Sequence, residues 1–403
     1  MGKRQIIFLI SVLAVCCLLA GCGKKPSDGV TITIWHDKED AIAEVLQTEL
    51  DKLAPDIKVK LEKKNGLTES LKMVGKDPKA APDMYFFAHD KIGVYGEMGI
   101  LSPITDFVDK SVLDNYLDMT IEAATYKDEI YQLPIYFETL LYMYNRALMY
   151  DDQVPETTEE LYAFMKEHTS GDNYGFVEQH STAYYSAGWI HGFGSELISE
   201  DGQPLLNTDK IKQALEYHLK FTKLMPGESE YTTVNTLFLE GHAASTINGP
   251  WFVPSAREAG LSIGIAPMPI VDATGMPLAP YSGVQGLHVL KVASEDEKKH
   301  EAIKKILNHL IQPDIGIAMA AASGCAPAYK ECYEKEEVKN DEMVMMMRET
   351  AESAVPMPNV PAMDVMWNVT GNMLVEINMS GTNIETATNV AQEKATELIN
   401  AME

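Results

Sequence analysis

For its length the chain has few cysteines and few positive charges, and beyond residue 21 it has no long apolar run. Its five cysteines include no Cys-x-x-Cys pair and no cluster with histidine, so we expect neither a metal ion nor a cofactor. Lys and Arg number 33 against 59 Asp and Glu, which gives a net charge of −26. Because nucleic acids are bound by Lys and Arg on phosphates, this composition argues against nucleic acid as a partner.

The first 21 residues have the features of a secretion signal. Lys3 and Arg4 precede an apolar run of about 16 residues from Ile6 to Gly21, which is too short to span a bilayer. Residues 19–22 read Leu-Ala-Gly-Cys and resemble the bacterial lipobox, where a peptidase cuts before a cysteine that carries a diacylglycerol. We therefore predict a lipoprotein signal peptide over residues 1–21, a polar tether over 22–29, and an extracytoplasmic protein held on the membrane only by the lipid on Cys22.

The remaining two cysteines leave two alternatives open. Cys325 and Cys332 are separated by seven residues, a spacing that fixes no disulfide geometry. An extracellular setting permits a disulfide between them. Two free thiols are the other alternative.

Short alternating strands and amphipathic helices predict an α/β protein. The expected strands cover residues 30–35, 57–61, 83–87, 140–144, 243–247 and 286–290. The expected helices cover residues 41–53, 157–168, 207–224 and 295–311, with Thr157 and Glu160 as a capping box for the second. We expect the charged stretch 330–341 to be the solvated face of a helix. Ligands of parallel sheets bind beyond the carboxyl ends of strands, which makes residues 35–40 and 87–91 a candidate site.

The predicted strand ends combine carboxylates, cations and aromatic rings. Ionised carboxylates hold sugar hydroxyls by charge-assisted hydrogen bonds, and the apolar faces of a pyranose lie flat on aromatic rings. This mixture therefore suits a sugar. The side chains concerned are Trp35, Asp37, Lys38, Phe87, Asp90, Lys91, Glu138, Tyr184, Tyr185, Trp251 and Trp367.

Several of these residues lie in motifs of one known family. Residues 30–38 (Val-Thr-Ile-Thr-Ile-Trp-His-Asp-Lys), 81–90 (with Phe-Ala-His-Asp at the end) and 133–138 (Leu-Pro-Ile-Tyr-Phe-Glu) are followed by 144–145 (Tyr-Asn), 246–251 (Thr-Ile-Asn-Gly-Pro-Trp) and 357–361 (Met-Pro-Asn-Val-Pro). In this order they resemble the maltose/maltodextrin-binding proteins of bacterial ABC importers. The resemblance covers nearly the whole chain after the signal.

The resemblance implies a two-lobe periplasmic-binding-protein-like fold with a hinge and an interlobe ligand cleft. We expect lobe 1 to contain residues 30–136 plus about 286–331, and lobe 2 residues 137–285 plus about 332–403. The implied function is to capture maltodextrin-type oligosaccharides, without catalysis, for the permease subunits of an ABC importer. We expect a monomer. The implied sugar-binding residues are Asp37, Lys38, Phe87, Asp90, Lys91, Glu138, Tyr184, Trp251, Met357 and Trp367.

The chain also departs from the family pattern. Phe87 stands where Trp is usual, and Lys91 replaces an Arg whose planar, two-pronged contact it cannot reproduce. The usual acid two residues before the stacking Tyr is absent, and whether Glu178 substitutes for it stays open. Two alternatives stay open: a receptor of the same fold for another oligosaccharide or polyol, and a glycoside hydrolase with two opposed carboxyl groups.

Overall fold

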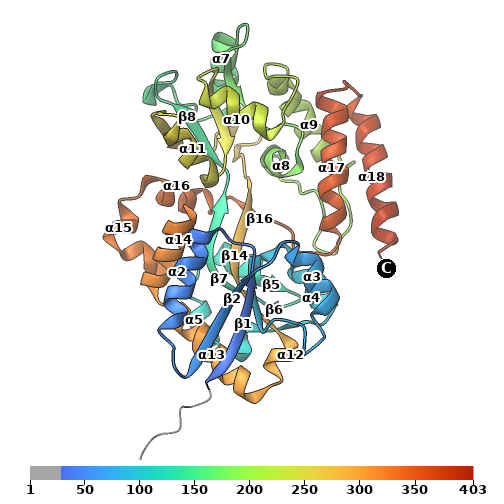
Figure 1. The fold of residues 1–403 in the computed structure, drawn as a ribbon. Helices are drawn as coiled ribbons and strands as arrows, with labels where there is room; N and C mark the ends of the chain where they lie inside the picture. Colours follow the sequence, from blue (N-terminus) through green and yellow to red (C-terminus); the bar gives the residue numbers. More distant parts are fainter. Residues whose placement is uncertain (1–28, 403) are drawn as a thin grey trace, which may run out of the picture.

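The computed structural model describes residues 29–402, so the predicted signal peptide and Cys22 lie outside the described residues. Two lobes lie one above the other (Figure 1). Each lobe is built on its own β-sheet with helices packed around it. Among the described residues, no helix combines the length and the apolar character that a membrane crossing requires.

The first lobe, at the bottom of Figure 1, contains a mixed eight-stranded sheet. Six of its strands lie in the order β15-β7-β14-β3-β1-β2, and β4 and β16 each pair with β14. β14 pairs antiparallel with both β3 and β7, whereas β1 pairs parallel with β2 and β3. The strands are β1 (Val30–His36), β2 (Ile57–Lys63), β3 (Met84–Ala88), β4 (Leu101–Ser102), β7 (Leu133–Thr139), β14 (Tyr281–Leu290), β15 (Ala326–Pro327) and β16 (Val355–Pro356). The accompanying helices are α2 (Asp40–Asp51), α3 (Leu67–Val74), α4 (Ile92–Glu97), α5 (Lys110–Leu113), α6 (Asp118–Ala124), α12 (Lys291–Ser294), α13 (Glu297–Leu310) and α14 (Pro313–Ser323).

The second lobe contains a four-stranded sheet with the order β11-β8-β10-β9. Its strands are β8 (Leu141–Asn145), β9 (Tyr174–Val177), β10 (Ala243–Asn248) and β11 (Ile263–Ala266). Its helices are α7 (Thr158–His168), α8 (Ala183–His191), α9 (Asp209–Thr222), α10 (Tyr231–Leu239), α11 (Val253–Glu258), α17 (Met363–Asn378) and α18 (Ile384–Asn400). The last two form an antiparallel pair beside α8 and α9 (Figure 1). The short helices α15 (Glu336–Lys339) and α16 (Glu342–Thr350) lie near the junction of the lobes.

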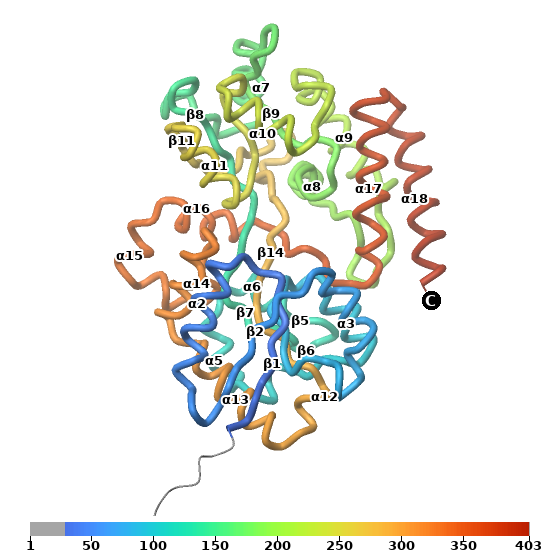
Figure 2. The backbone as a smooth tube through the Cα atoms, viewed as in Figure 1, coloured from blue at the N-terminus to red at the C-terminus, as the bar shows by residue number. Residues whose placement is uncertain are grey.

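The chain passes between the lobes three times, as the tube in Figure 2 shows. It crosses at Leu140, between β7 and β8, then between β11 and β14, and finally between β16 and α17. At the junction, β7, β14 and β16 are hydrogen-bonded neighbours, since Ser282 pairs with Thr139 on one side and with Pro356 on the other. The residue limits predicted for the lobes stay a prediction; β7 and β14 extend past the expected boundaries at 136 and 286.

The six predicted strands and the helices predicted over 41–53, 157–168, 207–224 and 295–311 are confirmed, with shifts of a few residues at most of their ends. The Thr157 and Glu160 side chains form the expected capping box of α7. The expected strand at 286–290 is longer, because it begins at Tyr281 and runs fully buried to Leu290. The charged stretch 330–341 is mostly helical and exposed, as expected, but it does not form one continuous helix. Lys335 has an extended backbone there, which separates a 3₁₀ turn (Lys330–Glu334) from α15.

Candidate functional site

Polar side chains follow three strands at one edge of the first-lobe sheet. β1 and β3 are parallel, and β7 runs in the same direction because β14 is antiparallel to both β3 and β7. Asp37 and Lys38 therefore follow β1 at the same edge where Asp90 and Lys91 follow β3 and where Glu138 lies near the end of β7. This edge faces the junction with the second lobe (Figure 1).

Lys38, Gln285 and Glu138 form a hydrogen-bonded chain across this edge. The Lys38 ammonium lies 2.9 Å from Asp37 Oδ1 and donates to Gln285 Oε1 at 2.6 Å. Gln285 Nε2 in turn donates to Glu138 Oε1 at 3.1 Å. Lys38 also lies 5.5 Å from the ring centre of Phe87, within the range of a cation–π contact. These hydrogen bonds hold the buried ammonium of Lys38 and the partly buried carboxylate of Glu138 in one arrangement.

The backbone of β14 leaves room for the Glu138 side chain. A Cβ on Gly283 would come within 2.9 Å of Glu138 Oε1, so only glycine allows the carboxylate this position. The Cys325 sulfur lies 3.7 Å from Glu138 Oε2. Burial raises the pKa of Glu138, and the nearby charge of Lys38 opposes that increase. Cys325 and Cys332 are both free and buried, so the disulfide alternative is wrong.

Asp90 and Lys91 form a separate group beside the first. The Lys91 ammonium lies 3.1 Å from Asp90 Oδ2 and forms an ion pair with Asp364, in the first turn of α17. Burial alone would lower the pKa of Lys91, but the charges of the two carboxylates outweigh it and raise the pKa. Lys91 is thus already occupied by two acids.

Aromatic side chains gather on the second-lobe side. Tyr184, in the first turn of α8, has its ring centre 6.4 Å from that of Trp251 and 6.4 Å from that of Tyr281. Tyr281 also contacts Trp367 of α17, edge to face, at 5.5 Å. Trp251 is 37% exposed, so it does not fill the core between the lobes. A Cβ on Gly249 would come within 2.2 Å of the Trp251 ring, so the ring lies directly over that glycine.

Glu138 and Tyr184 connect the two sets. Burial raises the pKa of Tyr184 far above its usual value, and the negative charge of Glu138 is the next largest cause. Tyr281, whose ring centre lies 6.4 Å from that of Tyr184, accepts a hydrogen bond from Thr139 Oγ1 through its carbonyl oxygen at 3.1 Å. The aromatic side chains therefore adjoin the end of β7, which carries Glu138. Met357 is also at the junction: its carbonyl accepts a hydrogen bond from His89 Nε2 at 2.8 Å, and its N–H donates to Ser282 O at 3.0 Å.

Glu178, the candidate substitute for the missing family acid, is 1% exposed. Its carboxylate accepts hydrogen bonds from the Trp189 indole at 3.0 and 3.1 Å and also pairs with His218. Those bonds hold it inside the second lobe. It is therefore a core residue and does not replace the missing acid.

Comparison with known proteins agrees with this architecture. The family described as bacterial extracellular solute-binding protein matches residues 47–346. The chain belongs to this family. A maltotriose-binding protein of Pyrococcus abyssi is 28% identical over 86% of the chain and 77% of its own length. A galactooligosaccharide-binding protein of Bacillus subtilis is 27% identical over 100% and 98%, and a maltooligosaccharide ABC transporter solute-binding lipoprotein of Streptococcus pneumoniae is 25% identical over 93% and 92%.

A solved structure supports the same fold for this solute-binding protein. The crystal structure of a cyclo/maltodextrin-binding protein complexed with maltotetraose superimposes with a TM-score of 0.83 at 26% identity. The superposition covers 95% of this chain and 100% of the other. The two-lobe fold with a hinge is therefore shared along almost the entire chain.

Sequence reasoning missed three residues of this solute-binding protein's junction. Gln285 and Tyr281 lie on the part of β14 that was not predicted as strand, and Cys325 precedes a strand of two residues. All ten residues of β14 are buried, so its sequence does not show the alternation of apolar and polar residues that predicts a strand. Trp35, in contrast, was included with the strand-end aromatic residues and is 8% exposed in the first-lobe core.

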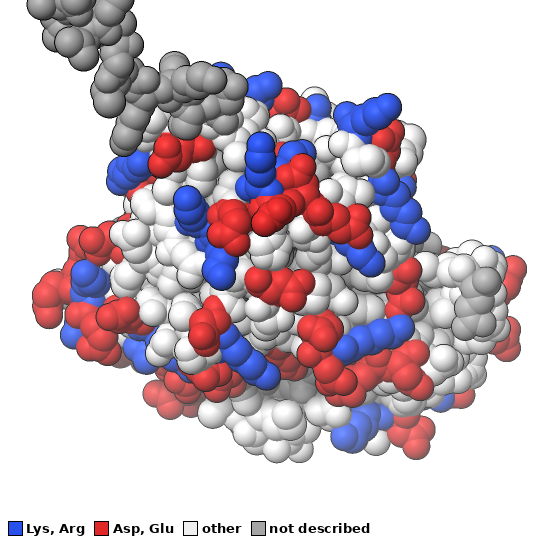
Figure 3. Space-filling view, turned by 90° about the horizontal axis from the view of Figure 1, so that it is seen from below, with Lys and Arg blue, Asp and Glu red and all other residues white. Residues whose placement is uncertain are grey.

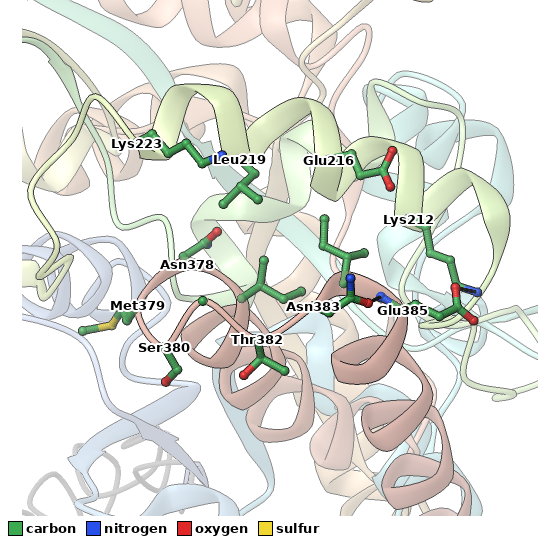
Figure 4. Close-up of a pocket in the computed structure, with 13 residues that line it drawn as sticks. Lys212, Glu216, Leu219, Lys223, Asn378, Met379, Ser380, Thr382, Asn383 and Glu385 are labelled. Atoms are coloured by element: carbon green, nitrogen blue, oxygen red, sulfur yellow. Dashed lines mark hydrogen bonds and ion pairs between the residues drawn. The ribbon is translucent and has the colours of Figure 1, made fainter.

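One pocket lies away from the junction. It has a volume of about 510 Å³ and lies between α9 and the loop joining α17 to α18, as Figure 4 shows. Two of its polar side chains pair with each other, since Lys212 lies 2.7 Å from Glu385, and Asn383 caps α18. It contains none of the predicted site residues. Within residues 29–402, no group of three or more metal-ligating side chains has formed.

Proposed function

We propose that the protein captures a maltodextrin-type oligosaccharide between its lobes and delivers it to the permease subunits of an ABC importer. One observation carries the proposal: the carboxylate and ammonium groups at the end of β7 adjoin the aromatic rings of the second lobe, because Tyr281, bonded to Thr139 beside Glu138, has its ring centre 6.4 Å from that of Tyr184. Hydroxyl groups would bond to Asp37, Lys38, Asp90 and Glu138, and sugar faces would stack on Tyr184, Trp251 and Trp367. The maltooligosaccharide-binding relatives support this ligand class.

Capture would proceed by hinge closure. Only a closed form offers contacts from both lobes to one ligand, so the ligand shifts the equilibrium toward closure. Micromolar affinity requires about −8.2 kcal/mol, which a few charge-assisted bonds and two or three stacked rings supply after ordering costs. Phe87 would contribute a smaller stacking surface than the Trp usual in the family, and Met357 would line the same site.

Lys91 would contribute less to the ligand than the sequence implies. It already pairs with both Asp90 and Asp364, and a sugar would have to compete with those partners. We therefore assign Lys91 mainly to holding Asp90 and α17 in place. Asp90 remains available through its second oxygen.

A galactooligosaccharide is the second candidate ligand. The relative of that name in Bacillus subtilis matches the whole chain at nearly the same identity as the maltotriose-binding relative. Titration calorimetry with maltotriose, maltotetraose, a β-galactotriose and a xylotriose separates the candidates. Preferential binding of the maltosaccharides supports the proposal. Binding of the galactosaccharide alone would instead identify a galactooligosaccharide as the ligand. Heat from none of the four would refute an oligosaccharide receptor of either type.

We further propose that the protein does not cleave its ligand. A glycosidase needs two carboxyl groups about 5–9.5 Å apart across the scissile bond. The family that matches this chain is one of solute-binding proteins, and Glu138 and Asp90 at the junction already have Gln285 and Lys91 as partners. Incubation with maltoheptaose followed by chromatography tests this point, and time-dependent shortening of the sugar would contradict it.

We also propose the lipid anchor on Cys22 as the only membrane attachment. Figure 3 supports this for the face that it shows, because Lys and Arg side chains are interspersed with Asp and Glu there and do not form one basic patch. A variant in which residues 1–22 are replaced by a signal peptide that is removed without lipidation should carry neither the lipid nor the apolar leader, so cell fractionation should recover it from the soluble fraction. Retention of the variant in the membrane fraction after a high-salt wash would contradict the proposal.

A further inference from the structure

Gln285 is the middle residue of the hydrogen-bonded series Lys38–Gln285–Glu138 at the junction. It is 7% exposed and lies on β14, one of the strands that reach the junction between the lobes. Its amide orientation is determined by chemistry: an ammonium group only donates hydrogen bonds, so the amide oxygen must face Lys38. The amide nitrogen therefore faces Glu138, at 3.1 Å.

The contact with Gln285 leaves some of the hydrogen-bond acceptor sites of Glu138 unused. An ionised carboxylate has about four acceptor sites, and Gln285 occupies one of them on Oε1. The thiol of Cys325 borders the other oxygen at 3.7 Å, although the same sulfur lies 3.5 Å from Ser323 O and its single hydrogen can serve one acceptor at a time. The acceptor sites that remain are free to receive hydroxyl hydrogens of a ligand.

We propose that Gln285 is a positioning residue of the binding site, which holds Glu138 as an ionised acceptor for hydroxyl groups of the ligand. Gln285 acts through Glu138 and separates it from Lys38, so that the two charges do not form a direct ion pair that would occupy the carboxylate. This inference rests on the proposed function and adds the residue that determines the chemistry of one contact.

The charged and titratable groups around Glu138 determine how its pKa would respond to the loss of Gln285. They are Asp37 and Lys38 after β1, Tyr136 on β7, Tyr184 on α8 and Cys325 before β15. Burial raises the pKa of Glu138, while Lys38 and the hydrogen bond from Gln285 lower it. Removing that bond raises the pKa further, and the carboxylate then takes up a proton at a higher pH. If Gln285 only filled space, its loss would not change the pH at which Glu138 is half protonated, which is the Glu138 midpoint.

The test is titration calorimetry with maltotriose between about pH 5 and 8 on the wild type and on Gln285→Met, which keeps the chain length and removes the amide. We expect about tenfold weaker binding near pH 7, because a hydrogen bond to an ionised group is lost. We also expect the acid-side fall in affinity to begin at a higher pH than in the wild type. Gln213→Met, at an exposed position of α9, is the matched control and should change neither quantity.

Two further variants keep the outcome decisive. Glu138→Gln should remove the acid-side fall and so identify the titrating group. Gln285→Glu preserves the shape and the contact with Lys38, and should move the midpoint upward even if Gln285→Met does not fold. A ¹³C NMR titration of the Glu138 carboxyl in ligand-free protein provides the same midpoint without sugar.

The outcomes are distinguishable. Unchanged affinity and an unchanged Glu138 midpoint in both Gln285 variants would overturn this inference while leaving the receptor function intact. Absence of binding by the wild type to any oligosaccharide would overturn the proposed function, and with it the role of Gln285 toward a ligand.

Discussion

Replacing Trp251 by alanine should weaken oligosaccharide binding at least tenfold. The exposed fraction of this residue is 37%, and an aromatic side chain has about 150–250 Å² of surface, so about 55–95 Å² is available to a ligand. Covering that area at about 25 cal/mol per Å² contributes about 1.4–2.3 kcal/mol, which corresponds to about a 10- to 50-fold change in the dissociation constant.

Titration calorimetry with maltotriose measures this change directly. The variant Trp251→Phe should lose less, because it keeps a flat ring of smaller area. Tyr150→Ala removes another exposed aromatic ring, 66% exposed and outside the junction, and should bind like the wild type. Unchanged affinity of Trp251→Ala, with an unchanged unfolding temperature, would show that the ring is not a stacking surface.

Three further substitutions test other parts of the structure. Gly283→Ala places a methyl group within 2.9 Å of Glu138 Oε1 and should weaken binding about tenfold by displacing that side chain. Calorimetry measures this loss. The control Gly227→Ala, whose added methyl group meets open space, should bind like the wild type. Burial lowers the pKa of His191 to about 4, so its contribution to stability is present above about pH 6.5 and is lost as the pH falls toward 4. Urea unfolding should show about 1.2 kcal/mol less stability from this residue at pH 5.5 than at pH 7, and an equal pH dependence in His191→Gln would contradict this. Glu178→Ala leaves a buried indole and imidazole unpaired and should lower the free energy of unfolding by about 3–5 kcal/mol; a loss under 1 kcal/mol would be incompatible with that network.

Local patterns were sufficient for much of the fold. The alternation of residues 30–35 is determined by which face of β1 is buried, and Ile32 and Ile34 are fully buried as that pattern requires. Thr157 caps α7 because a hydroxyl at that position satisfies a free N–H of the first turn. The shared edge of β1 and β3 followed from the parallel-sheet rule alone, and the resemblance extended the prediction to two lobes.

Other features depend on partners far away in the sequence. Gln285 contacts residues 247 and 147 positions away, and neither separation leaves a local periodic signal. The resemblance suggested Lys91 for a ligand contact, but it could not reveal that Asp364, 273 positions later, pairs with it. Glu178 was considered for the site from its position alone, and only the fold shows that Trp189 bonds to it.

The proposed ligand contacts and the proposed hinge occupy the same strands. Glu138 is two residues before the crossing at Leu140, and Tyr281 begins the strand that returns from the second lobe. Thr139 Oγ1 donates to Tyr281 O at 3.1 Å, so these two segments are bonded to each other within the junction. A ligand that bonds Glu138 and stacks near Tyr281 would therefore act on the segments through which any rotation of one lobe against the other must pass. This placement would couple binding to closure through direct contact, because the groups that recognise the sugar belong to the segments that move.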